Sequence, residues 1–202
     1  MINLDERLLR LARTRGHAPG VERAVARFSR LGEHGAVWFS IGAAGYALDR
    51  RRRPEWGRAV GAVAGAFALN TLTKLVVRRR RPEIPGLPPL ISTPTQLSFP
   101  SAHASTSFAG ACAYSRLGVS AGGLYGLAGG LAASRLYLGV HYPSDVVAGA
   151  VLGSVVGAFA GRRGRVALRE EAQRLAADSR DRAEMARLGE EMDEITPPWP
   201  AD

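Results

Sequence analysis

Three clusters of charged and polar residues interrupt the apolar middle of this 202-residue chain. In chain order they are Lys74 with Arg81, then Ser101, Ala102 and His103, then Arg135 with His141 and Asp145. Charged side chains in such surroundings are costly unless they have partners or a function. All three clusters are therefore functional candidates.

The three cations in these clusters suit an anion. Lys74, Arg81 and Arg135 placed around one point could hold a phosphate group, with bidentate hydrogen bonds from the two arginines. A helix that starts at residues 101–103 would add free backbone N–H groups and the positive end of its dipole. The combination predicts a phosphate-binding site.

Two histidines would supply the reaction chemistry. His141 is followed four residues later by Asp145, which would hold the ring in one tautomer and stabilise its charged form. His103 would protonate a leaving oxygen. We expect no metal and no cofactor, because the cations already neutralise the charge that develops on a transferring phosphoryl group.

Each cluster also allows a purely structural interpretation. The arginines at 78–81 could anchor a helix end among lipid headgroups, and Ser101 could be the N-cap of a helix. His103 could be a satisfied core histidine, and His141 with Asp145 could be a structural pair across a helix start.

The elements that must position these residues favour the functional interpretation. Five apolar segments occupy residues 35–48, 59–77, 102–117, 119–140 and 143–161. A segment of about 19 residues is about 28 Å long as a helix, close to the thickness of a bilayer core. If all five segments span a membrane, the three clusters all fall on one membrane face.

Charge and small residues favour a membrane over the buried all-α core of a soluble protein, which is the alternative. The net charge of +9 is concentrated in arginine blocks at the ends of apolar segments. Nucleic-acid binding would need basic residues spread along a face, so we expect no nucleic-acid partner. Glycines at roughly four-residue spacing allow close helix packing in lipid. We therefore predict an all-α, polytopic membrane helical bundle of about five spanning helices.

The predicted transmembrane domain covers residues 35–161, and the two ends of the chain outside it have a different character. Residues 1–34 are predicted to form amphipathic helices in the membrane interface, broken near residues 16–20. Residues 162–202 are predicted to form a polar helical tail, either at the membrane surface or as a pairing segment in a homo-oligomer. The single cysteine, Cys112, excludes a disulfide framework.

The clusters also carry a family resemblance, which covers about residues 35–161. The chain resembles the type 2 phosphatidic acid phosphatase (PAP2) superfamily in all three parts of its signature, which appear in order as Lys74-x6-Arg81-Pro82, Pro100-Ser101-Ala102-His103 and Ser134-Arg135-x5-His141-x3-Asp145.

This resemblance implies a role for each site residue. It makes His141 the nucleophile that forms a phosphohistidine, with Asp145 behind it, and His103 the general acid. It assigns phosphate binding to Lys74, Arg81, Ser101 and Arg135, and to the backbone N–H of Ala102. The family usually has glycine at that last position. The N–H survives the change to alanine, but the allowed backbone angles narrow.

Within the family, a compact five-span chain resembles the bacterial lipid phosphatases. Their substrates include phosphatidate, phosphatidylglycerol phosphate, polyprenyl diphosphates and polyprenyl-linked sugar phosphates such as decaprenylphosphoryl-5-phosphoribose. The expected partners are thus a phosphorylated lipid and the bilayer. The proline-containing loop at 83–98 would shape specificity.

The positions of the arginines predict how the protein is oriented in the membrane. Arginines at 50–53, at the end opposite the site, predict that the site lies on the extracytoplasmic face of the cell membrane.

The alternative function is a non-catalytic membrane protein that binds a phosphorylated lipid, which Ala102 alone favours.

Overall fold

The computed structural model describes residues 4–195, without the side chains of 161–172, 189–191 and 193–195. The chain divides into two compact units, Met1–Arg162 and Arg163–Asp202. The described part is built from helices, with two isolated β-bridges in a loop. The α-helices are α1 (Leu4–Thr14), α2 (Pro19–Arg30), α3 (Ala36–Leu48), α4 (Arg53–Val77), α5 (Ala102–Tyr114), α6 (Ala121–Tyr137) and α7 (Pro143–Ile195), with 3-10 turns η1 (Glu33–Gly35), η2 (Arg50–Arg52) and η3 (Ser115–Leu117). The prediction of an all-α fold is confirmed.

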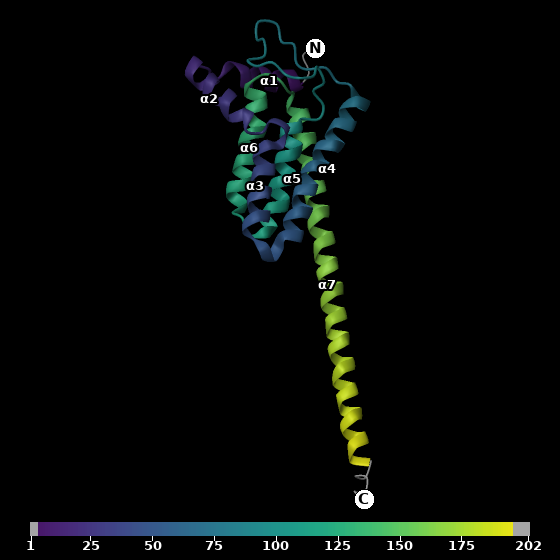
Figure 1. The fold of residues 1–202 in the computed structure, drawn as a ribbon. Coiled ribbons are helices and arrows are strands. Elements are labelled where there is room, and N and C mark those ends of the chain that lie inside the picture. Colours follow the sequence, from purple (N-terminus) through teal and green to yellow (C-terminus); the bar gives the residue numbers. More distant parts are fainter. Residues whose placement is uncertain (1–3, 196–202) are drawn as a thin grey trace, which may run out of the picture. The chain divides into compact units, whose positions relative to one another are not determined.

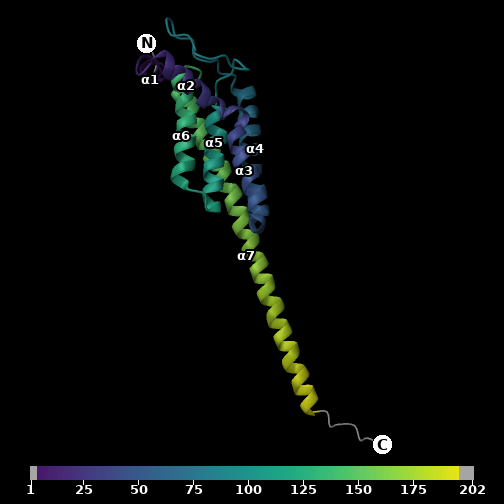
Figure 2. The same cartoon turned by 60° about the vertical axis from the view of Figure 1, so that its left-hand side comes forward.

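Within the first unit, α3, α4, α5 and α6 run side by side, and α1, α2 and the loop at 78–101 lie across one end of them (Figures 1 and 2). Each apolar segment of the sequence coincides with all or part of one of the helices α3 to α7, although α4 begins before its segment and α7 continues beyond its segment. The predicted break in the N-terminal region falls between α1 and α2, where Pro19 starts the second helix.

Two helices are long and apolar enough to cross a bilayer, over Arg50–Val77 and Pro143–Ala160. Only 22% of each window is buried, whereas the core helix of a soluble protein would be mostly covered. Their exposed residues include many large apolar ones, among them Leu69, Leu72, Val76, Val147, Val151, Val155 and Phe159. Apolar faces of this extent need lipid or protein to cover them.

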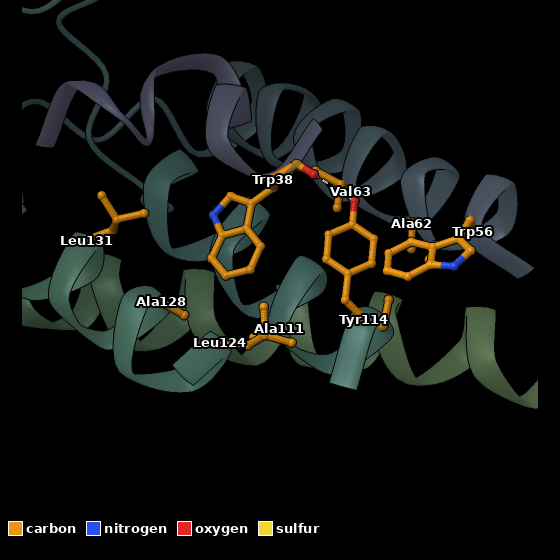
Figure 3. Close-up of a cluster of buried hydrophobic side chains, with 11 residues drawn as sticks. Trp38, Trp56, Ala62, Val63, Ala111, Tyr114, Leu124, Ala128 and Leu131 are labelled. Carbon is orange, nitrogen blue, oxygen red and sulfur yellow. Dashed lines mark hydrogen bonds between the residues drawn. The ribbon is translucent and has the colours of Figure 1, made fainter. Parts of the chain in front are cut away.

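The core of the first unit lies around α5, which is buried along nearly its whole length. Trp38 of α3, Trp56 of α4 and Tyr114 of α5 meet there as large aromatic side chains (Figure 3). The polar groups of the two fully buried aromatic residues both have hydrogen-bond partners. The Tyr114 hydroxyl donates to the Trp38 carbonyl at 2.9 Å, and Trp38 Nε1 donates to Ser107 Oγ at 2.9 Å.

A row of glycines brings α7 against the backbone of α5. A Cβ on Gly149, Gly153 or Gly157 would lie 2.6, 2.1 or 2.7 Å from a carbonyl oxygen of α5. This is the close approach that small residues at four-residue spacing predict. Three glycines of α6 behave differently, since a Cβ on Gly122, Gly126 or Gly129 would meet nothing within 4 Å.

We expect Gly153→Ala to destabilise the protein strongly, because the new methyl group would collide with the Ser105 carbonyl. Overpacking of this kind costs about 3 kcal/mol. Thermal unfolding in detergent should therefore begin about 5–10 °C lower. Gly126→Ala is the matched control and should unfold as the wild type does. Equal unfolding temperatures for the two variants would contradict the packing described here.

The second unit is the helical part of the predicted tail. Its described side chains are exposed, including the apolar residues Leu175, Met185, Leu188 and Met192. Leu168, Ala172 and Ile195, which complete the apolar pattern, have side chains outside the described set, and the proline-rich end at 196–202 lies outside the described residues. Pairing of this segment between subunits stays a prediction.

Candidate active site

The fold brings the predicted site residues to one end of the bundle. Lys74 lies in the last turn of α4 and Arg135 in the last turn of α6. Ser101 precedes α5, and His141 precedes α7, which carries Asp145 in its first turn. The C-terminal ends of α4 and α6 and the N-terminal ends of α5 and α7 thus supply residues of all three clusters.

These residues surround a cavity of about 530 Å³. Its lining includes Lys74, Arg81, Ala102, His103, Arg135 and His141. Ser101 and Asp145 lie behind that lining and are fully buried. The cavity continues past the cations to the rim formed by η1 and to the loop at 91–95.

The three cations are held by neutral oxygens and not by carboxylates. Lys74 Nζ donates to the carbonyls of Leu97 and Ser98, at 3.1 and 3.2 Å. Arg81 donates to the carbonyls of Thr95 and Val140, at 2.8 and 2.7 Å. Arg135 Nη1 donates to a serine hydroxyl at 2.8 Å, and its Nε has no partner.

No carboxylate of the described side chains lies within ion-pair distance of these three cations. Burial lowers the pKa of Arg81 to about 10, with Asp145 acting in the opposite direction, so this guanidinium stays charged at neutral pH. A cavity with an excess of positive charge and free N–H donors is built to receive an anion.

His141 is placed as a neutral base whose lone pair is on Nε2. Its Nε2 lies 3.2 Å from Arg81 Nη1, which has only hydrogens to offer, so Nε2 is the acceptor and Nδ1 carries the proton. Nδ1 lies 3.4 Å from Asp145 Oδ2, which is slightly too long for a good hydrogen bond. A small movement of either side chain would form one. Burial lowers the pKa of His141 to about 3, while the Asp145 carboxylate acts in the opposite direction.

This lowered pKa predicts how stability depends on pH. Below pH 6.5, the ordinary value for histidine, the unfolded chain binds a proton at His141 that the native protein does not bind until about pH 3. Native stability therefore falls as pH decreases through this range. Thermal unfolding of His141→Gln and of the wild type, compared at pH 7.5, 6, 5 and 4.5, should show the variant gaining about 1 kcal/mol per pH unit below 6.5. Parallel curves would rule out a buried neutral histidine.

Ser101 and Ala102 form the start of α5. The hydroxyl of Ser101 does not cap the helix and has no partner among the described residues, although the residue is fully buried. Ser101 thus occupies the N-cap position that the structural interpretation gives it, but its side chain makes no capping hydrogen bond. Ala102 has a negative φ, because the residues other than glycine with positive φ in the described chain are His34 and Arg78. Alanine fits this position without strain.

Asp145 is held by a residue that sequence reasoning placed elsewhere. Its Oδ2 accepts from the backbone N–H of Tyr142, and its Oδ1 accepts from Arg79 Nη1, both at 2.9 Å. The Arg79 guanidinium also pairs with Asp5 of α1 at 2.8 Å. The structural interpretation of the arginine run at 78–81 is a headgroup anchor, but Arg79 contacts Asp145 and Arg81 lines the cavity.

Three further polar residues were missed by sequence reasoning. Asn70, one turn before Lys74, is buried and donates to the Pro100 carbonyl at 3.1 Å and to Ser105 Oγ at 3.0 Å. An amide in the middle of an apolar segment could have revealed it. Ser29 and Asp5 lie in amphipathic helices, where a single polar residue carries no signal.

No group of three or more His, Cys, Asp and Glu side chains is placed to hold a metal ion within the part of the chain that the structure describes. The single cysteine, Cys112, is buried and free, as its uniqueness predicts.

Comparison with known proteins gives two kinds of relative. The PAP2 superfamily model matches residues 55–164. The chain is 43% identical over 147 residues to the decaprenylphosphoryl-5-phosphoribose phosphatase of Mycobacterium tuberculosis, covering 70% of this chain and 79% of that one. It is 45% identical over 135 residues to the protein of the same name from Mycolicibacterium smegmatis, covering 65% and 72%.

Two crystal structures share the fold. LpxE from Aquifex aeolicus superimposes with a TM-score of 0.69 and 25% identity, over 80% of this chain and 96% of that one. The first transmembrane PAP2 type phosphatidylglycerolphosphate phosphatase from Bacillus subtilis superimposes with a TM-score of 0.63 and 22% identity, over 80% and 84%.

Proposed function

Because this chain belongs to the PAP2 superfamily, as a membrane-bound lipid phosphatase, we propose that it removes the phosphomonoester of a polyprenyl-phosphoryl pentose phosphate, namely decaprenylphosphoryl-5-phosphoribose or a close analogue. The family that the three signature clusters predict is confirmed, and so is the enzyme class. The observation that carries the finer proposal is the identity of 43–45% with phosphatases that bear this substrate in their names.

The mechanism follows the roles that the sequence predicts. His141 Nε2 attacks the phosphorus atom, the bond to the ester oxygen breaks, and His103 gives that oxygen a proton. Water then attacks the phosphohistidine, His103 takes a proton from it, and inorganic phosphate leaves. Three observations support this scheme. His141 is neutral with its lone pair toward Arg81, and the three cations have no carboxylate partner among the described side chains. The hydroxyl of Ser101 has no hydrogen-bond partner among the described residues.

The same cations support a reaction without a metal ion. The positive charges of Lys74, Arg81 and Arg135 stabilise the negative charge on the oxygens of the phosphoryl group in the transition state. Activity in the presence of EDTA tests this directly.

We also propose that α3, α4, α5, α6 and the first part of α7 all cross the bilayer. The helices α3 and α5 have 13 residues each, about 20 Å of helix, and the adjoining turns η1 and η3 extend them. The arginines of η2 and Arg116 of η3 lie at the ends of helices opposite the site. The positive-inside rule then puts the site on the extracytoplasmic face.

The rim of the cavity supports a headgroup that carries hydroxyls. Glu33 and His34 of η1 are exposed and line the cavity beyond the cations. His34 has a φ of +52°, a left-handed conformation that costs energy for a residue other than glycine and is common at functional sites. A carboxylate repels phosphate but accepts hydrogen bonds from sugar hydroxyls, so Glu33 suits a ribose next to the reacting phosphate.

The deciding experiment is phosphate release by detergent-purified protein with EDTA present. The substrates are a polyprenyl-phosphoryl pentose phosphate, phosphatidate and a polyprenyl diphosphate. We expect release from all three to depend on His141 and kcat/KM to be highest for the pentose phosphate. A preference for either other lipid would replace the proposed substrate. Phosphate binding without release from any lipid would favour the non-catalytic alternative, which the unstrained Ala102 does not support.

We expect Glu33→Gln to lower kcat/KM for the pentose phosphate lipid about tenfold, because a charged hydrogen bond to a hydroxyl is lost. The value for phosphatidate, which has no sugar, should not fall. Glu83→Gln is the matched control, since Glu83 lines the neighbouring cavity of about 350 Å³. Equal losses on both substrates would show that Glu33 does not read the headgroup.

A further inference from the structure

Ser29, in the last turn of α2, is buried at the junction of two signature clusters. Its side chain and backbone contact Arg135, Ser134 and His103, which follow it by 106, 105 and 74 residues. The residue is 1% exposed although α2 is otherwise mostly at the surface. We propose that Ser29 is a positioning residue of the phosphate site, which fixes the Arg135 guanidinium for phosphate and sets the tautomer of His103. This inference rests on the roles proposed above for those two residues.

The hydroxyl of Ser29 holds one edge of the Arg135 guanidinium. Ser29 Oγ accepts from Arg135 Nη1 at 2.8 Å and lies 3.0 Å from Ser134 Oγ. Arg135 Nε is buried without a partner, and Arg135 has no carboxylate partner in the described chain. A guanidinium presents five donors in a fixed plane, so fixing Nη1 orients the remaining donors. Those donors are left for an anion.

The carbonyl of Ser29 acts on the second cluster. It lies 2.9 Å from His103 Nε2, and a carbonyl can only accept, so this nitrogen carries the proton. Nδ1 is then the ring nitrogen that exchanges a proton during the reaction. This carbonyl lies in the last turn of α2, where the helix itself supplies no i+4 partner, and its two lone pairs let it accept from His103 as well as from the turn that follows the helix.

The turn after α2 is shaped for the same contact. Gly32 N–H donates to the Ser29 carbonyl at 3.0 Å, which closes the turn directly after the helix. A Cβ on Gly32 would lie 2.7 Å from His103 Cδ2 and 3.2 Å from Nε2. Only glycine lets the turn approach the imidazole this closely.

The test uses Ser29→Ala, which removes the hydroxyl and leaves the carbonyl in place. We expect KM for phosphatidate and the inhibition constant of inorganic phosphate each to rise about tenfold, with kcat changed less than threefold. Ser107→Ala is the matched control, a buried serine whose hydroxyl accepts from Trp38 of the core. It can lower the unfolding temperature but should leave KM and the inhibition constant unchanged.

A double-mutant cycle separates positioning from general destabilisation. In an Arg135→Ala background, Ser29→Ala should cause no further loss of phosphate affinity, because the guanidinium that it orients is gone. Phosphate affinity measured by calorimetry gives this result even if the enzyme hydrolyses none of the proposed lipids, so the two proposals can fail separately. Unchanged phosphate affinity in Ser29→Ala, or a full loss repeated in the Arg135→Ala background, would overturn the inference.

Discussion

His141→Ala should release no measurable phosphate from any lipid substrate, while its affinity for inorganic phosphate stays within about threefold of the wild type. The variant removes the only group that the proposed mechanism uses to form a bond to phosphorus. Lys74, Arg81 and Arg135 keep their carbonyl and hydroxyl partners, since just one of their hydrogen bonds, from Arg81 to Nε2, involves His141. Binding and turnover should therefore separate.

The loss should exceed about 10⁴-fold, because removing a nucleophile leaves only the electrostatic part of catalysis. Phosphate release from phosphatidate and calorimetric titration with phosphate are the two measurements. His17→Ala is a control for loss of a histidine, since His17 stacks on Tyr137 at the end of α6 and does not line the cavity. An active His141→Ala enzyme would remove this residue from the role of nucleophile.

Arg79→Ala should have the second largest effect, lowering kcat about 100-fold. Arg79 is the only cation within ion-pair distance of Asp145 in the described chain, and the Asp145 side chain is fully buried. Removing one partner of a buried pair costs about 3 kcal/mol or more, which corresponds to about 100-fold if the whole effect falls on the reaction. The uncompensated carboxylate would take up a proton or move toward another donor, and either change removes the support of His141.

The matched control is Arg80→Ala, which deletes the same charge one residue further along. Arg80 is exposed, and its described contacts are made by its backbone. Steady-state kinetics on phosphatidate should thus show a large fall in kcat for Arg79→Ala and almost none for Arg80→Ala. Similar losses in the two variants would mean that the net charge of the loop matters and not the contact with Asp145.

The signature residues could be predicted because charge in an apolar segment is rare and conspicuous. Arg135 and Asp145 need partners wherever the chain buries them, and the alternation of segments places them at one end of the bundle. The glycines of α7 were equally visible, and their spacing predicts the contact with α5. For Gly122, Gly126 and Gly129 of α6 the same spacing predicts a close contact that the structure does not show, because spacing does not tell which face of a helix meets a neighbour.

The partners of the signature residues could not be predicted. Asp5 and Ser29 lie in amphipathic helices full of polar residues, so neither residue type nor spacing distinguishes them. Their roles arise from the tertiary packing of α1 and α2 across the end of the bundle, which brings together residues more than 70 positions apart. The prediction that residues 1–34 lie in the membrane interface concerns the surface of α1 and α2 that faces away from the bundle. It does not include the contacts that these two helices make with the site.

Lys74, Arg81 and Arg135 have no carboxylate partner among the described side chains, and this affects the lifetime of the protein. Three like charges held together in one cavity repel one another, so an anion that binds there stabilises the native enzyme. Each phosphate that enters offsets this repulsion, and ligands that bind only the native state add to its stability. Substrate supply would then govern how much folded enzyme persists as well as how fast it works. A membrane depleted of the phosphorylated lipid would expose the phosphatase to proteolysis, and a membrane rich in that lipid would preserve it.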